Sequence, residues 1–314
     1  MIHRRLPRIG LLTVIGAATV AAGFVTIAAQ ERREAAEPAG KLQIQAVALD
    51  RGDRPVMDLR QEELEVWVGP YRVPIDRVTA LTADDRAVRT IVLLLDDLVL
   101  DPAMSPRVKE AGRRLIARMA PGDRMAIATL DRNQVEFSED PAQLTRRLDE
   151  HFGGRGMYDR VTELMLERVA SLASRMAELP GRKAIVAIGG AWLFDTPIYA
   201  AGPDLRREWT GAMRALAFAG ASVYVVDPAG VGTARTGRGD DGFARESGGR
   251  SFANTNDLAA AADQILREID NHYVIEIADP PVLRKSDLRE LDLRTTRKDI
   301  TVRARRWIPG APGK

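Results

Sequence analysis

The chain has 314 residues, of which 45% are hydrophobic and 29% are charged, and its formal net charge is +2. This composition supports a normal hydrophobic core, and the near balance of charges argues against a nucleic-acid-binding surface, which needs clustered positive charge. The sequence contains no cysteine, which excludes disulfide scaffolds, thiol catalysis and zinc–thiolate sites.

The N-terminal region predicts export. A basic start, which includes Arg4 and Arg5, precedes Ile9–Ala29, a stretch without any charged residue. As a helix this stretch would span about 31 Å, close to the thickness of a bilayer core. Two interpretations of residues 1–30 stay open, a signal peptide cleaved after Ala29 and a retained signal anchor. In both, the protein is periplasmic, held at the inner membrane or secreted, and it contacts the membrane only through this segment.

The following segments predict a small β unit. Residues 31–41 are polar and are expected to form a linker. Leu42–Leu49 and Glu63–Val68 alternate between apolar and polar residues, as half-buried strands do, and Tyr71–Val78 adds a further strand. The β unit is expected to cover residues 42–86.

Residues 87–280 alternate between apolar strands and amphipathic helices. Thr90–Leu95 is a continuous apolar run, which is typical of a strand buried on both faces of a parallel sheet. The later elements are expected to be helices at 104–119, 142–151, 157–179, 204–219 and 256–270, and strands at 125–130, 134–137, 183–188, 222–226 and 273–277. This order predicts a doubly wound α/β fold with a mainly parallel, Rossmann-like sheet. Ligands of such sheets bind beyond the carboxyl ends of the strands, at the point where the strand order reverses.

The C-terminal part is expected to return to the β unit. Within residues 281–307, Leu288–Leu293 and Ile300–Ala304 alternate and predict a hairpin that packs on the N-terminal strands. Residues 308–314 are rich in proline and glycine and are expected to form a tail.

Several short motifs follow one another along residues 42–307: Leu49–Val56, Leu64–Val66, Leu95–Asp97, Gly153-Gly154, Tyr158-Asp159, Val226-Asp227, Glu246–Gly249, Tyr273 and Val302–Arg306. In their order and spacing, they resemble the motifs of proteins related to the von Willebrand factor type A (VWA) domain, in particular those common in acidobacteria. In the first motif, Gly52 stands one place earlier than the glycine of the family, whose position is taken by Asp53. The resemblance implies a VWA-like fold and a binding or adhesive role without catalysis.

VWA domains usually bind Mg²⁺ through an Asp-x-Ser-x-Ser loop, a threonine on a later loop and an aspartate after the fourth strand. The resemblance places Asp96 at the first aspartate, Leu98 and Leu100 at the serines, Arg155 at the threonine, and Gly189 or Gly190 at the late aspartate. Because Mg²⁺ requires six oxygen ligands at about 2.0–2.1 Å, a site that keeps only Asp96 is expected to be degenerate, without a cofactor. A frame shifted by one residue has carboxylates at Asp97 and Asp101, so residual cation binding through Asp96 and Asp97 stays open as an alternative.

Arg155 suggests what replaced the metal. Its guanidinium is a fixed cation suited to carboxylates, so one hypothesis is that Arg155 neutralises Asp96 or Asp97. The alternative is that it points to solvent from a glycine-rich loop. Asp195 could reach the same rim, and we therefore take Asp97, Asp101, Arg155 and Asp195 as candidate residues of a binding loop.

The expected function is that of an exported, non-enzymatic module whose loops at 96–106, 151–159 and 189–199 meet a protein partner. A hydrolase that uses a carboxylate pair is a second class, but Asp96 and Asp97 are adjacent on an extended segment and their side chains diverge. A phosphoacceptor receiver domain is a third class. It needs a lysine after the fifth strand, where this chain has Asp227-Pro228.

Other motifs have structural interpretations that we prefer to functional ones. Gly153–Gly156 could cradle a phosphate but lacks the lysine and hydroxyl residue of a P-loop. We expect a strand-end turn at Asp227-Pro228, a helix C-cap at Glu246–Gly249, surface or capping roles for His151 and His272, and a chance match to an integrin-binding tripeptide at Arg238-Gly239-Asp240.

Overall fold

The computed structural model describes residues 42–85, 87–132, 134–154, 156, 160–189, 202–231, 242–277 and 288–309. All of them belong to one compact unit, Lys41–Lys314. The predicted export segment Ile9–Ala29 and the Arg238-Gly239-Asp240 tripeptide lie outside the described residues. Among the helices that are described, none is long and apolar enough to cross a membrane.

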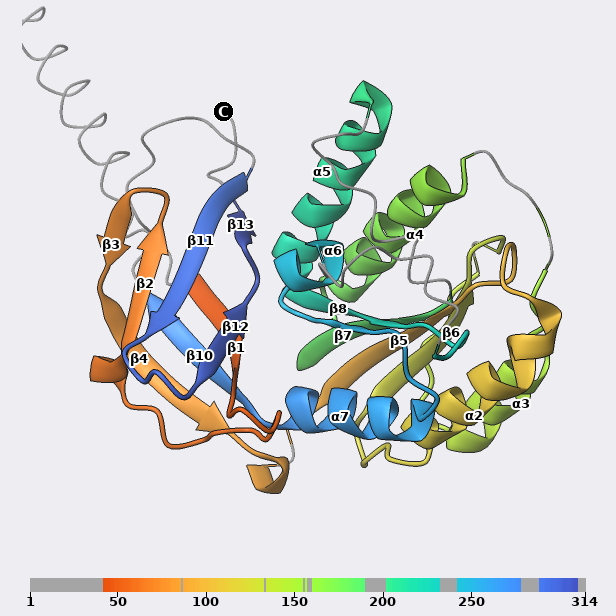
Figure 1. The fold of residues 1–314 in the computed structure, drawn as a ribbon, viewed down its shortest axis with the longest axis horizontal. Coiled ribbons are helices and arrows are strands. Elements are labelled where there is room, and N and C mark those ends of the chain that lie inside the picture. The colour runs from red at the N-terminus through yellow and green to blue at the C-terminus, as the bar shows by residue number, and fades with distance from the viewer. Residues whose placement is uncertain are drawn as a thin grey trace, which may run out of the picture. The chain divides into compact units, whose positions relative to one another are not determined.

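A five-stranded parallel sheet forms the centre of the α/β part (Figure 1). Its strand order is β6 (Arg124–Thr129), β5 (Arg89–Leu95), β7 (Arg182–Ile188), β8 (Ala221–Val226) and β9 (Ser251–Phe252). The chain leaves β5 for β6 on one side and resumes with β7 on the other, so the carboxyl ends of β5 and β7 form the switch point of the sheet. The predicted doubly wound α/β fold is therefore confirmed.

Helices cover both faces of this sheet (Figure 1). One face carries α4 (Val161–Met176), α5 (Pro203–Ala219) and α6 (Gly242–Glu246), and the other carries α2 (Ser105–Ile116), α3 (Pro141–Asp149) and α7 (Leu258–Asp270). Three short 3-10 helices complete the helical elements of the described chain: η1 (Gln61–Glu63), η2 (Ala83–Asp85) and η3 (Pro102–Met104). The helix expected at 204–219 is α5, and it is capped by Gly220, whose φ of 67° is left-handed.

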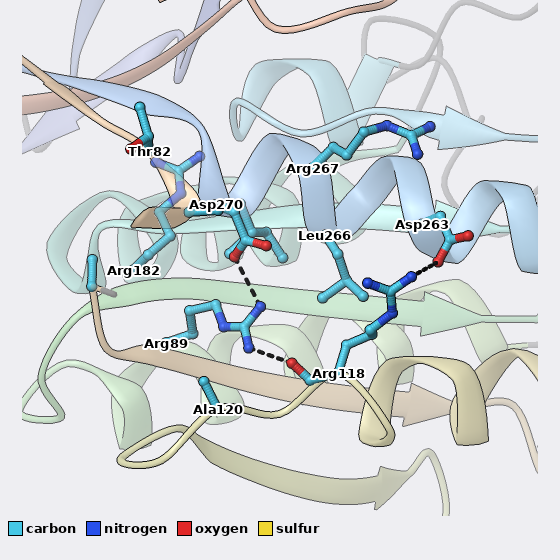
Figure 2. Close-up of a pocket in the computed structure, with 12 residues that line it drawn as sticks. Thr82, Arg89, Arg118, Ala120, Arg182, Asp263, Leu266, Arg267 and Asp270 are labelled. Atoms are coloured by element: carbon cyan, nitrogen blue, oxygen red, sulfur yellow. Dashed lines mark hydrogen bonds and ion pairs between the residues drawn. The ribbon is translucent and has the colours of Figure 1, made fainter. Parts of the chain in front are cut away.

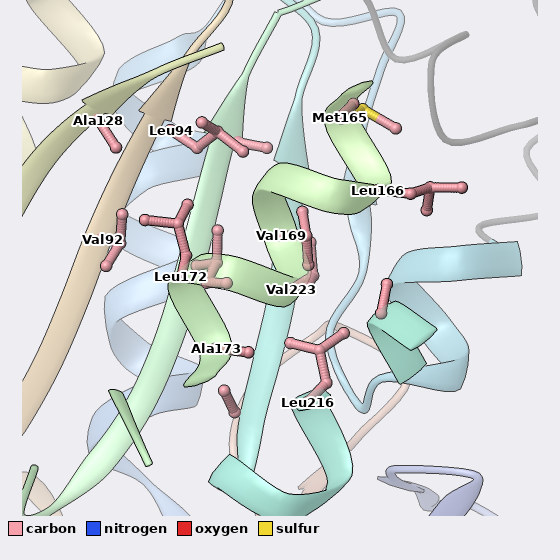
Figure 3. Close-up of a cluster of buried hydrophobic side chains, with 14 of the residues drawn as sticks. Val92, Leu94, Ala128, Met165, Leu166, Val169, Leu172, Ala173, Leu216 and Val223 are labelled. Carbon is pink, nitrogen blue, oxygen red and sulfur yellow. The ribbon is translucent and has the colours of Figure 1, made fainter. Parts of the chain in front are cut away.

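The residues of β5 alternate between the two cores. Val92 and Leu94 point into the cluster under α4 and α5, where they join Leu172 and Leu216 (Figure 3). Ile91, Leu93 and Leu95 point into the cluster under α2, α3 and α7. The strand is apolar throughout because both of its faces are buried.

The remaining strands form two antiparallel sheets. One has the order β12 (Thr301–Ala304), β1 (Leu42–Leu49), β10 (His272–Ile277), β4 (Ile75–Leu81), and the other has the order β13 (Trp307–Pro309), β11 (Leu288–Thr295), β2 (Leu64–Val68), β3 (Tyr71–Val73). Ile44 and Tyr273 of the first sheet share a hydrophobic core with Val66 and Leu291 of the second. N- and C-terminal strands therefore build a flanking β unit, as predicted.

Two predictions about the central sheet were wrong. The strand at 273–277 pairs with β1 and β4 of the β unit, and the central sheet ends with β9, which has only two residues. The expected strand at 134–137 is reduced to a single antiparallel bridge between Met125 and Ser138. An apolar alternation shows that one face is buried, but it does not show which sheet the strand joins.

Two predictions about the C-terminus were also wrong. The strands predicted as a hairpin at 288–293 and 300–304 lie in different sheets, β11 beside β2 and β12 beside β1. The tail was expected to include Ile308 and Pro309, but Ile308 is fully buried and both residues belong to β13, which pairs with β11.

Candidate functional site

Asp96 is the first residue after β5, at the switch point of the parallel sheet. Only 3% of its surface is exposed, and its Oδ1 atom accepts hydrogen bonds from the backbone N–H groups of Leu98 and Val99, both at 3.0 Å. The backbone N–H of Asp96 donates to Ile188 at the end of β7, at 3.1 Å. The carboxylate thus closes the turn that follows β5.

The two leucines at the family's serine positions are buried on opposite sides of the sheet. Leu98 belongs to the cluster under α4 and α5, and Leu100 to the cluster under α2, α3 and α7. Each is 6% exposed. The loop after β5 is therefore anchored by apolar packing at the positions where the family has hydroxyl ligands.

Asp97 connects the loop after β5 to the loop after β6. Its Oδ1 atom accepts hydrogen bonds from the backbone N–H groups of Leu130 at 2.9 Å and Asp131 at 3.2 Å. Arg168 of α4 holds the same loop, since its Nε donates to the carbonyl of Thr129 at 2.9 Å. This carboxylate is engaged with backbone donors of a neighbouring segment.

Gly153 and Gly154 pack directly against the backbone of the loop after β5. A Cβ atom at Gly153 would lie 2.6 Å from the carbonyl oxygen of Leu100, and one at Gly154 would lie 2.5 Å from that of Asp97. Gly156 donates its N–H to the carbonyl of Leu98 at 2.8 Å, and Gly153 donates to the buried hydroxyl of Ser105 at 3.0 Å. These glycines are needed for close approach of two backbones.

Two aromatic residues, His151 and Phe152, lie in the turn between α3 and these glycines, and only the second is exposed. His151 is 5% exposed, and neither of its ring nitrogens has a hydrogen-bond partner in the described part of the chain. Burial lowers the pKa of His151, and the nearby charge of Asp97 offsets part of this effect. Phe152, the next residue, is 66% exposed. Of the surface or capping roles predicted for His151 and His272, the surface role was wrong, because His151 is 5% exposed and His272 is 2% exposed. His272 has the capping role, since it hydrogen-bonds to the backbone of Ile269 in the last turn of α7.

The described residues do not fit the Mg²⁺ site of the VWA family. A Cβ atom at Gly189 would lie 2.6 Å from Cβ of Asp96, so Gly189, one of the two positions expected for the late aspartate, has no room for a side chain. The cavity beside Asp96 is lined by apolar groups such as Leu94 and Met165, and its volume of about 10 Å³ is that of one water molecule at most. Within the described ranges, no group of three or more His, Cys, Asp or Glu side chains could hold a metal ion.

The other predicted residues of the binding loop are only partly described. Asp101 caps η3, where its Oδ1 accepts the N–H of Ala103 at 2.9 Å. The carboxylate of Asp101 therefore binds backbone within its own loop, whereas that of Asp97 binds the backbone of the loop after β6. Arg155, Asp195 and Gly190 lie outside the described residues, so the hypothesis that Arg155 neutralises Asp96 or Asp97 stays a prediction.

Two further motifs have the structural roles that the sequence indicated. Asp227 is followed by a turn, and its Oδ1 accepts the N–H of Ala229 at 2.9 Å; burial raises the pKa of Asp227. Ser247 follows α6, where its Oγ accepts the N–H of Val223 at 2.8 Å and donates to the carbonyl of Ala244 at 2.7 Å. The hydroxyl of Ser247 is buried and engaged in these two bonds.

No protein-family model matches the sequence, and no curated protein matches it either. Among solved structures, the chain is similar to a von Willebrand factor type A protein from Catenulispora acidiphila, with a TM-score of 0.40 and 9% identity over 76% of this chain and 73% of that one. It is also similar to the pilus adhesin RrgA from Streptococcus pneumoniae, with a TM-score of 0.26 and 12% identity over 46% of this chain and 24% of the adhesin. The fold assignment rests on the strand order of the sheet.

The predicted loop 151–159 already placed His151 and Phe152 at this edge of the sheet, but the sequence did not single out either side chain. It also did not reveal that Arg168 belongs to this edge. A signal existed for Arg168, since it follows Val161 and Met165 at helical spacing on the buried face of α4. An arginine at such a position needs acceptors, which the carbonyls of the β6 loop supply. No comparable signal marked Phe152.

Proposed function

We propose that this protein is an exported, non-enzymatic VWA-like interaction module that binds a protein partner at the carboxyl edge of its parallel sheet, without a divalent cation. One observation carries the proposal. Phe152 is 66% exposed although both of its neighbours, His151 and Gly153, are buried. An aromatic side chain presented from a backbone that is already held in place is the kind of residue that dominates protein interfaces.

The rigidity of this edge supports the proposal. The loop after β5 is fixed by Asp96, by the two buried leucines and by the close contact of Gly153 and Gly154 with its backbone. Val231, which follows the end of β8, is 60% exposed. Loops on a rigid sheet lose little conformational entropy when they bind.

Site-specific photocrosslinking tests the partner surface. A photoreactive phenylalanine analogue would replace Phe152 in the full chain, expressed in the native cells. The matched control replaces Phe218, which is 61% exposed on α5 and precedes the amino end of β8. We expect a discrete protein adduct at position 152 that is absent at position 218. Equal adducts at both positions, or none at 152, would contradict the proposal.

Calorimetric titration of the full chain with Mg²⁺, Mn²⁺ and Ca²⁺ tests the part of the proposal that concerns metals. We expect no binding that depends on Asp96. Tight binding that is lost in Asp96→Ala and retained in a surface variant such as Glu290→Gln would show that a cation site remains.

Two assays test the remaining parts of the proposal. A screen with generic ester, glycoside and phosphate substrates should give no turnover that disappears in Asp96→Ala, since the carboxylates of Asp96 and Asp97 are bound to backbone donors.

N-terminal sequencing of the mature protein tests export, because a new N-terminus after Ala29 identifies a cleaved signal peptide. A protein found in the cytoplasm with an intact N-terminus would contradict it.

A further inference from the structure

A cavity of about 450 Å³ lies at the opposite, amino-terminal edge of the parallel sheet (Figure 2). Arg89 and Arg182, the first residues of β5 and β7, form part of its wall, and α7 forms another part. Thr82 and Ala87, which precede β5, complete one side. The volume is within the range of small-molecule sites, about 300–1,000 Å³.

Positive charge predominates among the described residues of the wall. Its charged members are Arg89, Arg118, Arg182, Arg267, Asp263 and Asp270. Guanidinium groups therefore outnumber carboxylates. Alanines together with Leu266 and Ile269 supply the apolar part of the wall.

The carboxylates near the cavity are already bound to other arginines. The carboxylate of Asp263 accepts hydrogen bonds from Nε and Nη2 of Arg114, at 2.9 and 2.7 Å. Arg114 itself does not line the cavity. Arg118 lies 3.8 Å from the same carboxylate and its side chain is 58% exposed. Asp270 is paired with Arg89 at 2.8 Å. The negative charges of Asp263 and Asp270 are thus mostly neutralised by Arg114 and Arg89, and they offset little of the positive charge of Arg118.

Arg182 is a buried cation with a neutral partner. It is 3% exposed, and its Nη1 donates to the amide oxygen of Gln45 at 2.6 Å. Its Nε atom has no hydrogen-bond partner among the described residues, and burial lowers the pKa of Arg182. The carboxylate of Glu268 acts on it electrostatically, but that group is bound to Arg303. A buried guanidinium without a carboxylate is costly unless an anion accompanies it.

We propose that this cavity binds a small organic dianion, whose carboxylate or phosphate oxygens contact Arg182 and Arg118 and whose carbon skeleton packs against Leu266 and Ile269. The wall of the cavity thus carries both an exposed cation, Arg118, and a buried one, Arg182, and this positive charge favours the entry of anions. Guanidinium groups bind carboxylates and phosphates alike through paired hydrogen bonds. The site is at the other edge of the sheet from Phe152, so it is independent of the proposed protein-binding function.

Calorimetric titration of the full chain with succinate and with inorganic phosphate tests the site. Sodium chloride keeps the ionic strength constant, and succinamide serves as the neutral analogue of succinate. Saturable binding of either anion without binding of succinamide supports the site and shows which oxyanion it accepts. If neither anion binds more strongly than chloride at equal ionic strength, the proposal is wrong.

Surface variants locate the binding without disturbing the buried arginine. We expect Arg118→Gln to weaken anion binding about threefold to fivefold and Asp263→Asn to strengthen it by a similar factor. Arg113→Gln is the matched control, because Arg113 lies near the end of α2, five residues before Arg118, is 51% exposed and pairs with Asp149 outside the cavity. An equal loss in Arg113→Gln and Arg118→Gln would mean a general charge effect and would overturn the assignment of the site.

Discussion

Glu268 of α7 binds Arg303 of β12 through its Oε2 atom, and its side chain is completely closed to solvent. Oε1 of the same carboxylate lies 3.4 Å from Nη1 of Arg250. Because α7 packs on the parallel sheet and β12 pairs with β1, this ion pair joins the α/β part to the β unit. Arg305 adds a second connection, as its Nη1 donates to the carbonyl of Ala217 at 3.0 Å.

Replacing Glu268 should strongly destabilise the protein. Glu268→Gln leaves Arg303, whose side chain is only 14% exposed, without its counter-ion, and breaking a largely buried pair in this way costs about 3–5 kcal/mol of the free energy of unfolding. Urea unfolding followed by circular dichroism measures the change. The control is Glu290→Gln, in which the lost partner of Arg306 is 51% exposed, and we expect less than about 1 kcal/mol there. Equal losses in the two variants would contradict a buried junction.

Gly154→Ala should destabilise the carboxyl edge of the sheet. The added Cβ would lie 2.5 Å from the carbonyl oxygen of Asp97, so the backbones must move apart, at a cost of about 1–3 kcal/mol. Gly211→Ala on α5 is the control, since nothing lies within 4 Å of its Cβ and alanine favours a helix by about 0.5–1 kcal/mol. Thermal unfolding should therefore show opposite shifts of Tm, and a neutral Gly154→Ala would argue against close packing of the two loops.

Introducing a serine at a position of the VWA metal motif should not create a metal site. Leu98→Ser removes a buried side chain from the cluster under α4 and α5 and should lower the free energy of unfolding by about 2–5 kcal/mol. Its hydroxyl would point into this core, so calorimetric titration with Mg²⁺ should show no gain in binding. Val231→Ser, at a side chain 60% exposed, should change stability by less than about 0.5 kcal/mol. Mg²⁺ binding by Leu98→Ser would contradict this prediction, because it would mean that the leucine alone prevents a metal from binding there.

Much of the architecture could be predicted because the central strands are buried on both faces. Ile91–Leu95 and Val223–Val226 are runs of buried hydrophobic residues, and such runs separated by amphipathic helices indicate a doubly wound sheet. The position of Asp96 at the switch point followed from the same pattern. By contrast, β9 has two residues, which is too short for any periodicity.

The chemistry of the two edges was less accessible to sequence reasoning. The sequence shows that Leu98 and Leu100 offer no oxygen, but not that they enter opposite cores, because that depends on the turn closed by Asp96. The arginine-lined cavity is assembled from segments as distant as Arg89 and Arg267. Such a site has no local motif, and only the topology brings its members together.

Acid should destabilise the protein through His272 well before most carboxylates are protonated. Burial, and secondarily the charge of Arg182, lowers the pKa of His272 to about 3 in the folded state. In the unfolded chain the pKa returns to about 6.5, so between these values the unfolded state binds the extra proton. The contribution of neutral His272 to the free energy of unfolding is therefore complete above pH 6.5. It falls by up to about 1.4 kcal/mol for each pH unit as the pH decreases towards 3.

Urea unfolding at pH 7, 6 and 5 measures this dependence while most carboxylates remain ionised. Below pH 6, His272→Gln should reduce the slope of the free energy of unfolding against pH by up to about 1.4 kcal/mol per pH unit, which corresponds to one proton. His151→Gln provides the comparison, because burial also lowers the pKa of His151 but the charge of Asp97 opposes the shift. We therefore expect the smaller change in slope from His151→Gln. An unchanged slope in His272→Gln would show that this imidazole does not remain neutral inside the folded protein.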